Sequence, residues 1–217
     1  MAAKAKPGND IYQLRVVLRG ISPLVWRRLL VRADSSVADL HEVLQIAFGW
    51  EDMHLNRFEI RGREYGVYRD GGQSFSTDAR QVRLRNLNLR RLERFVYEYD
   101  FGGLWVHDIR VEATLAADLK VTYPACVAGK CAAPPEDCGG PHAFMATRWR
   151  YCARGSGETG EDLDEWDEDL DEEGSVTGSS YHPDRFDRRQ VNRALALESI
   201  LKLGVVGTAT GTKEPRA

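Results

Sequence analysis

The sequence contains no run of about 20 apolar residues, so no membrane-spanning helix is expected. Its first ten residues, MAAKAKPGND, lack the apolar core of a secretory signal. The chain has only four cysteines. Without a secretory signal, these cysteines indicate a reducing compartment in which thiols are free or metal-bound rather than disulfide-bonded. We therefore expect a cytoplasmic protein that makes no membrane contact.

Several catalytic and nucleic-acid-binding signatures are also missing. The chain has no Walker-type glycine loop and no Gly-x-Ser-x-Gly nucleophile motif. It shows no helix-turn-helix, repeated zinc-finger or RNA-recognition signature. Ser22 stands in a Ser-Pro turn, and no spacing matches the residue sets of serine or tyrosine recombinases. Recombinase catalysis is therefore not expected, and whether the protein is an enzyme stays open.

Length and charge distribution predict one domain with polar appendages. Of the 217 residues, 42% are hydrophobic and 29% charged, which is ordinary for a globular protein. Residues 158–173 hold eleven acidic residues and no Lys or Arg, leaving a balance of about +8 for the rest of the chain. We expect a domain at 10–205 with an acidic flexible insertion at 154–180, and disordered tails at 1–9 and 206–217.

Hydrophobic periodicity predicts an α+β fold. Alternating apolar residues favour half-buried strands, and the Gly102-Gly103 turn joins two of them into a hairpin. A helix is expected to begin after Ser35-Ser36 and to end at Gly49. Strands are expected at 11–18, 24–32, 54–61, 93–100 and 104–113, with a long loop or loose hairpin at 62–80. Further helices are expected from Pro141 and from Asp187 to Gly204. These elements predict an antiparallel or mixed sheet packed by about three helices in two layers.

The most irregular stretch is Tyr123–Phe144, YPACVAGKCAAPPEDCGGPHAF. Pro134-Pro135 excludes a helix or central strand there, and Gly139-Gly140 permits tight turns. Pro141 suits the first position of a helix, whose positive end would lie near Glu136 and Asp137. We expect a rigid Cys/Pro/Gly-rich loop, either a structural clamp or a site.

Five runs between Ile11 and Leu201 carry a family resemblance: VWRRLL, LHEVLQIAFGW, YDFGGLWVHDI, PPEDCGG and HPDRFDRRQVNRAL. They resemble the plasmid pRiA4b ORF-3-like family. The resemblance implies a compact α+β domain found on plasmids, mobile elements and prokaryotic chromosomes, without an assigned activity, although some members carry resolvase-like names. Ala133 and Asn56 depart from the family pattern, which often has a cysteine and a second histidine at these positions.

Three groups of residues are candidates for a site. Thiolates and one imidazole are zinc ligands, and the candidate set is Cys126, Cys131, Cys138 and His142. Histidine with paired carboxylates suits acid/base chemistry, and the candidate set is His107, Glu136, Asp137 and His54. An arginine-rich run suits phosphate binding, and it comprises Arg80, Arg83, Arg85, Arg90, Arg91 and Arg94.

Each group also has an ordinary structural interpretation. The cysteines suit buried or free thiols, the histidines suit core positions, and the arginines suit a solvated sheet edge. The first functional hypothesis is a non-enzymatic accessory or binding module of mobile-element type, with nucleic acid or a protein as partner. The second is a metal-dependent enzyme of unknown substrate that uses His107, Glu136 and Asp137. The oligomeric state is not predicted.

Overall fold

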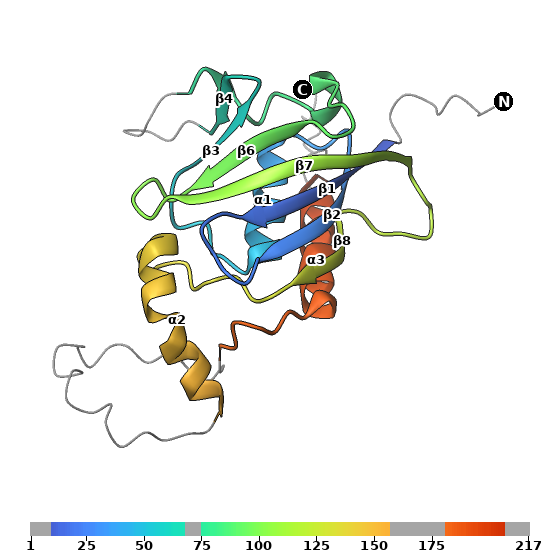
Figure 1. Ribbon diagram of the computed structural model, residues 1–217. Coiled ribbons are helices and arrows are strands. Elements are labelled where there is room, and N and C mark those ends of the chain that lie inside the picture. Colours follow the sequence, from blue (N-terminus) through green and yellow to red (C-terminus); the bar gives the residue numbers. More distant parts are fainter. Residues whose placement is uncertain (1–9, 68–74, 157–180, 207–217) are drawn as a thin grey trace, which may run out of the picture.

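The computed structural model describes residues 10–67, 75–156 and 181–206 of the chain. A mixed eight-stranded sheet, in the order β5-β4-β3-β6-β7-β1-β2-β8, is packed by helices (Figure 1). Every strand pair is antiparallel except β4–β5. The strands are β1 (Asp10–Leu18), β2 (Trp26–Arg32), β3 (Asn56–Ile60), β4 (Arg63–Gly66), β5 (Thr77–Asp78), β6 (Arg94–Tyr99), β7 (Trp105–Ala116) and β8 (Ala125–Lys130). The predicted α+β class is confirmed.

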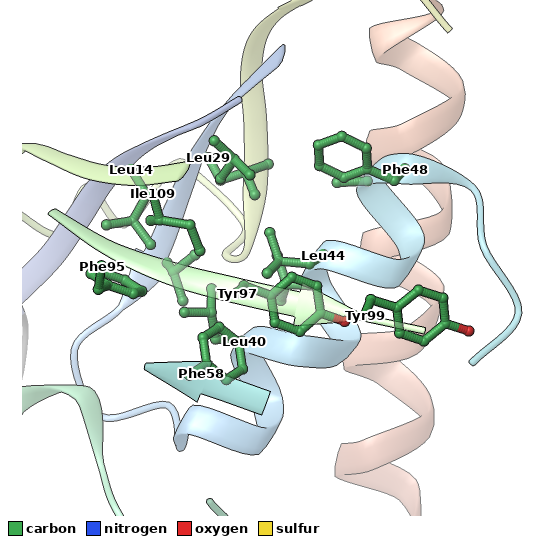
Figure 2. Packing of buried hydrophobic residues seen from close by; sticks show 14 of the residues in the cluster. Leu14, Leu29, Leu40, Leu44, Phe48, Phe58, Phe95, Tyr97, Tyr99 and Ile109 are labelled. Atoms are coloured by element: carbon green, nitrogen blue, oxygen red, sulfur yellow. The ribbon is translucent and has the colours of Figure 1, made fainter. Parts of the chain in front are cut away.

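Helix α1 (Val37–Phe48) has the boundaries that its capping residues predict. The Ser36 hydroxyl accepts the Asp39 N–H, and the Asp39 carboxylate accepts the Ser36 N–H, forming a capping box. Gly49 ends the helix with φ 74°, a left-handed conformation that glycine adopts readily. The helix lies across one face of the sheet, with Leu40 and Leu44 in the core (Figure 2).

Helix α3 (Arg188–Val206) lies on the same face of the sheet as α1 (Figure 1). The Asp187 carboxylate accepts the N–H groups of Arg189 and Gln190, so the predicted cap is present. The helix continues through Gly204, which was expected to end it. Among the described residues, α1 and α3 cover one face, whereas the opposite face, called the open face below, carries polar side chains and a few half-buried apolar ones.

Strands occur in a segment expected to be a long loop or loose hairpin and in one expected to be a rigid loop. Residues 62–80 include the short strands β4 and β5. Within Tyr123–Phe144, the first part is β8, which pairs with β2 at the edge of the sheet. No alternation of apolar residues marks β8 in the sequence. Its position depends instead on pairing with β2 and on Asn192 of α3. The Asn192 side chain exchanges hydrogen bonds of 2.7 and 2.9 Å with the Cys126 backbone. Helix α2 (Gly140–Ser156) follows the remaining loop.

Residues 1–9 and 207–217 of the predicted tails, and 157–180 of the acidic insertion, lie outside the described residues. Residue 206 belongs to α3 and residues 154–156 belong to α2, so the structure extends these helices into segments expected to be irregular. In the described part of the chain, no helix is both long and apolar enough to cross a membrane.

Candidate functional site

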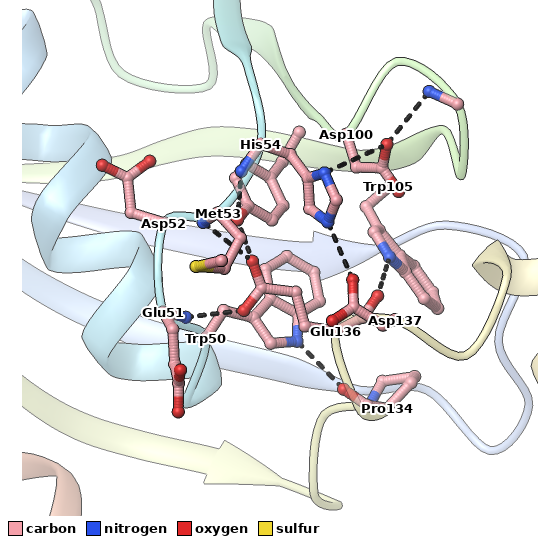
Figure 3. Close-up of polar contacts among 12 residues, drawn as sticks. Trp50, Glu51, Asp52, Met53, His54, Asp100, Trp105, Pro134, Glu136 and Asp137 are labelled. Atoms are coloured by element: carbon pink, nitrogen blue, oxygen red, sulfur yellow. Dashed lines mark hydrogen bonds and ion pairs between the residues drawn. The ribbon is translucent and has the colours of Figure 1, made fainter. Parts of the chain in front are cut away.

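The segment 133–139, called the acidic loop here, lies against the ends of β6 and β7 and the turn after α1. Two indoles donate hydrogen bonds to its backbone. Trp50 Nε1–H donates to the Pro134 carbonyl at 2.9 Å, and Trp105 Nε1–H donates to the Glu136 carbonyl at 3.2 Å (Figure 3). Both tryptophans are buried, so the loop is anchored on the aromatic end of the core.

The Glu136 carboxylate is occupied by three protein donors. It accepts the backbone N–H groups of Glu51 at 2.6 Å and Met53 at 3.2 Å. The third donor is the Tyr99 hydroxyl. Burial, followed by this contact, raises the pKa of Tyr99, so the phenol keeps its proton and donates at neutral pH. Glu136 therefore joins three chain segments and has little capacity left for a substrate.

His54 lies between two carboxylates, as Figure 3 shows. Its Nε2 is 2.8 Å from Asp137 Oδ1, and its Nδ1 is 3.8 Å from Asp100 Oδ1. The hydrogen bond with Asp137 raises the pKa of His54, with smaller contributions from Asp100 and Glu136. The Asp137 side chain is 75% exposed and the His54 side chain 33% exposed. These two side chains are a solvent-accessible proton donor and acceptor pair.

His107 lies apart from these residues, in the core beneath α1. It is 0% exposed and contacts the rings of Phe48 at 4.6 Å, Tyr97 at 5.2 Å and Trp50 at 5.3 Å. Neither ring nitrogen has a hydrogen-bond partner among the described residues. Burial lowers its pKa to about 3, so the ring is neutral at physiological pH. Of the four residues predicted to form a catalytic set, the structure thus brings together His54, Glu136 and Asp137, but not His107.

Sequence reasoning missed Trp50 and Tyr99, which hold the acidic loop. Tyr99 belongs to the alternating apolar pattern of β6, and Trp50 directly follows the Gly49 helix stop, so each aromatic residue was assigned to the core. Only their polar atoms, the indole N–H and the phenol O–H, distinguish them from the other core rings.

The cysteines and His142 do not form a ligand set in the described part of the chain. Cys126 is buried on β8, Cys131 is buried just after it, and Cys138 is half-buried in the acidic loop. Burial raises the pKa of Cys138 to about 11, which disfavours the thiolate form. No group of three or more His, Cys, Asp or Glu side chains suited to a metal ion occurs among the described residues. Zinc binding by these four residues stays a prediction from the sequence.

The open face carries a row of four arginines, one on each of four neighbouring strands. Arg15 on β1 is the register partner of Arg28 on β2 and of Arg110 on β7, and Arg110 is the partner of Arg94 on β6. Neighbouring strands lie about 4.8 Å apart, so this arginine row spans roughly 14 Å. Sequence analysis found only Arg94, because the other three come together through strand register, which no sequence motif encodes.

The arginine row is only partly neutralised. Glu112 pairs with Arg28 at 2.5 Å and with Arg110 at 3.6 Å, and the Arg28 contact is the main reason that the pKa of Glu112 falls to about 2. Among the described residues, no carboxylate forms an ion pair with Arg15 or Arg94. Like charges placed opposite each other across strands destabilise a sheet. Here Arg28 and Arg110 share a single carboxylate, and Arg15 and Arg94 have none among the described residues.

Two further features belong to the arginine row. The Trp26 ring lies under the guanidinium groups of Arg15, at 4.9 Å, and Arg28, at 5.6 Å. A depression of about 210 Å³ is lined by Arg15, Arg94, Arg110 and Asp108 together with two apolar residues. Asp108 itself is paired with Arg19 at 2.6 Å, which reduces its repulsion of an anion.

The arginines of the run 80–94 do not form one group in the structure. Arg80 pairs with Asp78 at 3.0 Å, and Arg83 is 3.9 Å from Asp39. Arg85 and Arg90 are exposed. Arg91 donates to the Glu112 carbonyl at 3.3 Å, which places it beside the arginine row.

Comparisons with known proteins place this geometry in a family. A family model described as plasmid pRiA4b ORF-3-like protein matches residues 10–190. The uncharacterised protein y4hQ of Sinorhizobium fredii (strain NBRC 101917 / NGR234) is 35% identical over 137 residues, covering 63% of this chain and 70% of that protein. The crystal structure of the protein of unknown function MM3350 from Methanosarcina mazei Go1 has a TM-score of 0.65 and 28% identity, covering 83% of this chain and 96% of that one. The chain therefore belongs to the plasmid pRiA4b ORF-3-like family, whose matched relatives are uncharacterised.

Proposed function

We propose that the protein is a non-enzymatic accessory module that binds the phosphate backbone of nucleic acid on the open face of its sheet. The observation that carries the proposal is the arginine row of Arg28, Arg15, Arg110 and Arg94, set in register across four strands. A row of like charges lowers the stability of the free protein, and an anionic partner would offset that repulsion.

The length of the arginine row favours a polymeric anion. A single phosphate group spans far less than roughly 14 Å. Duplex nucleic acid presents one phosphate charge per about 1.7 Å of its axis, so several phosphates lie within reach of the row at once. Backbone contacts of this kind carry no sequence information by themselves. We therefore expect binding with weak sequence preference.

Binding to a fluorescein-labelled 20-base-pair duplex and to its single strands, measured by fluorescence anisotropy between 50 and 200 mM salt, tests the proposal. If the row engages three or four phosphates, log K should fall with log salt at a slope near −3 for the duplex. The double variant R15Q/R94Q should reduce the slope by about two and weaken binding at least tenfold at the lower salt concentration.

The matched control is R193Q, which removes one positive charge from an exposed position on α3, the helix of the other face. It should leave the slope unchanged. Binding that is absent or insensitive to salt would remove nucleic acid as the partner and leave a protein partner. A loss per removed charge in R193Q equal to that in R15Q/R94Q would show that net charge, rather than the arginine row, drives binding.

A second candidate, an enzyme that works through the acidic loop, is supported by the exposed His54–Asp137 pair at 2.8 Å. Against it, Glu136 is committed to three donors and His107 lies in the core. Of the acidic and histidine groups described at this loop, a substrate would therefore meet His54, Asp137 and Asp100.

A further inference from the structure

Arg27 on β2 is a buried cation on the helix-covered side of the sheet. It is 2% exposed. Its guanidinium lies 4.0 Å from the centre of the Phe186 ring and 5.1 Å from that of Phe48. Phe186 reaches this position because Gly129, the register partner of Arg27 on β8, has no side chain: a Cβ there would lie 2.5 Å from the Phe186 ring.

The hydrogen bonds of Arg27 leave one nitrogen unused. Nε donates to the Ala47 carbonyl at 2.8 Å, and Nη1 donates to the carbonyls of Trp26 at 2.9 Å and Lys130 at 3.0 Å. A guanidinium has five N–H donors, so the two on Nη2 have no acceptor among the described residues. No carboxylate of the described residues forms an ion pair with Arg27. A buried charge without a counterion is unfavourable, since carbonyls and rings replace only part of its hydration.

Arg27 also lines a pocket of about 590 Å³ between the end of α1 and the start of α3. This volume lies within the range of small-molecule sites. Its apolar walls include Ile46, Phe48 and Phe186, and its polar lining residues besides Arg27 and Asp187 are Tyr181, His182, Arg185 and Gln190. Asp187 is the one acidic residue among the lining residues described, and its carboxylate is engaged in capping α3. The positive end of that helix dipole adds to the potential of the two arginines.

We propose that this pocket binds a small organic carboxylate with an aromatic or branched aliphatic group. One carboxylate oxygen would accept from Arg27 Nη2, the apolar group would pack against Phe48, Ile46 and Phe186, and Arg185 would contact the rim-facing oxygen. Arg27 offers one unengaged nitrogen, Nη2, and half of the lining residues are apolar. A monoanion with an apolar group therefore suits the pocket better than a phosphate ester, which requires more buried donors. This site is on the opposite side of the sheet from the arginine row and does not depend on nucleic-acid binding.

The probe is 4-fluorobenzoate, followed by ¹⁹F NMR, with 4-fluorobenzylamine as the cation of similar shape and 4-fluorophenyl phosphate as the dianion. The carboxylate should bind saturably with a Kd below about 10 mM, and the amine should not. Absence of saturable carboxylate binding, equal binding of the amine, or tighter binding of the phosphate ester would each overturn the proposal.

Variants locate the bound anion. R27M should weaken carboxylate binding at least tenfold, the effect expected for a lost hydrogen bond to a charged group. Because R27M changes the core, A194F supplies a second test: Ala194 is an exposed α3 residue that lines the pocket, and a phenyl group there should block it with Arg27 intact. R193Q, on the same helix, should bind as the wild type does. If A194F keeps full affinity, or if R15Q/R94Q loses it, the anion binds elsewhere and the proposal is wrong.

Discussion

Arg15 and Arg110 lie directly opposite each other on β1 and β7, and each has a further arginine as its partner on the next strand. Among the described residues, Glu112 is the one carboxylate that forms ion pairs with this row, and the nearby Asp108 is paired with Arg19. The proposed anion site on the open face would therefore lower the stability of the free sheet.

Removing one charge from the arginine row should therefore stabilise the free protein. We expect R94Q to raise the free energy of unfolding by up to about 1 kcal/mol at low salt, since Arg94 is exposed and repelled by Arg110. The gain should shrink at about 1 M salt, where screening is nearly complete. Urea denaturation at both salt concentrations measures it, with R193Q as the control. A lower stability of R94Q would mean that Arg94 makes a stabilising contact instead.

His107 should make the protein sensitive to acid. Its pKa in the folded protein is about 3, below the ordinary value of 6.5, so the unfolded chain binds a proton that the folded chain does not. The corresponding stability is fully present above pH 6.5 and is lost as pH falls from 6.5 towards 3. H107L should retain more of its neutral-pH stability at pH 4.5 than the wild type does, as measured by urea denaturation at pH 7.5 and 4.5.

The control for this pH dependence is H142Q, which changes an exposed histidine at the start of α2. Its acid sensitivity should match that of the wild type. If H107L loses as much stability on acidification as the wild type does, other groups cause the acid sensitivity and His107 is not responsible.

Elements that depend on neighbours in the chain were predicted from the sequence, whereas elements that depend on strand register were not. The Ser36 cap, the Gly49 stop and the β6–β7 hairpin were predicted, because each depends on neighbours in the chain. Strand β8 was missed because pairing with β2 places it, rather than any alternation of its own. The same limit explains why Arg15, Arg28 and Arg110 were not recognised as a group.

The candidate catalytic set shows a different limit. Alternation placed His54 and His107 on one face of their strands, but it cannot indicate depth along a strand. His107 pairs with Tyr97 in the middle of the sheet, whereas His54 precedes β3 at its end. One imidazole is therefore buried among rings, and the other lies at the surface between two carboxylates.

Glu136 should contribute more to stability than an ordinary surface carboxylate. E136Q replaces one acceptor oxygen by an NH₂ group that faces protein donors, so we expect a loss of about 1.5–3 kcal/mol in the free energy of unfolding. E51Q is the matched control, because Glu51 is exposed and uses only its backbone N–H in this contact. Urea denaturation compares the two variants. A change in E136Q no larger than in E51Q would show that the acidic loop is held by the tryptophans alone.

The His54–Asp137 pair should weaken as pH rises. The hydrogen bond with Asp137 raises the folded-state pKa of His54 above 6.5, so its stabilising contribution is complete below pH 6.5 and disappears as pH rises through the higher folded value. NMR titration of the His54 ring should give a pKa above 6.5 in the wild type and a lower one in D137N. D118N, which changes an aspartate in the loop between β7 and β8, should not alter it. If D137N leaves the pKa of His54 unchanged, Asp137 is not its hydrogen-bond partner in solution, and the acidic loop then presents no paired acid and base at the surface.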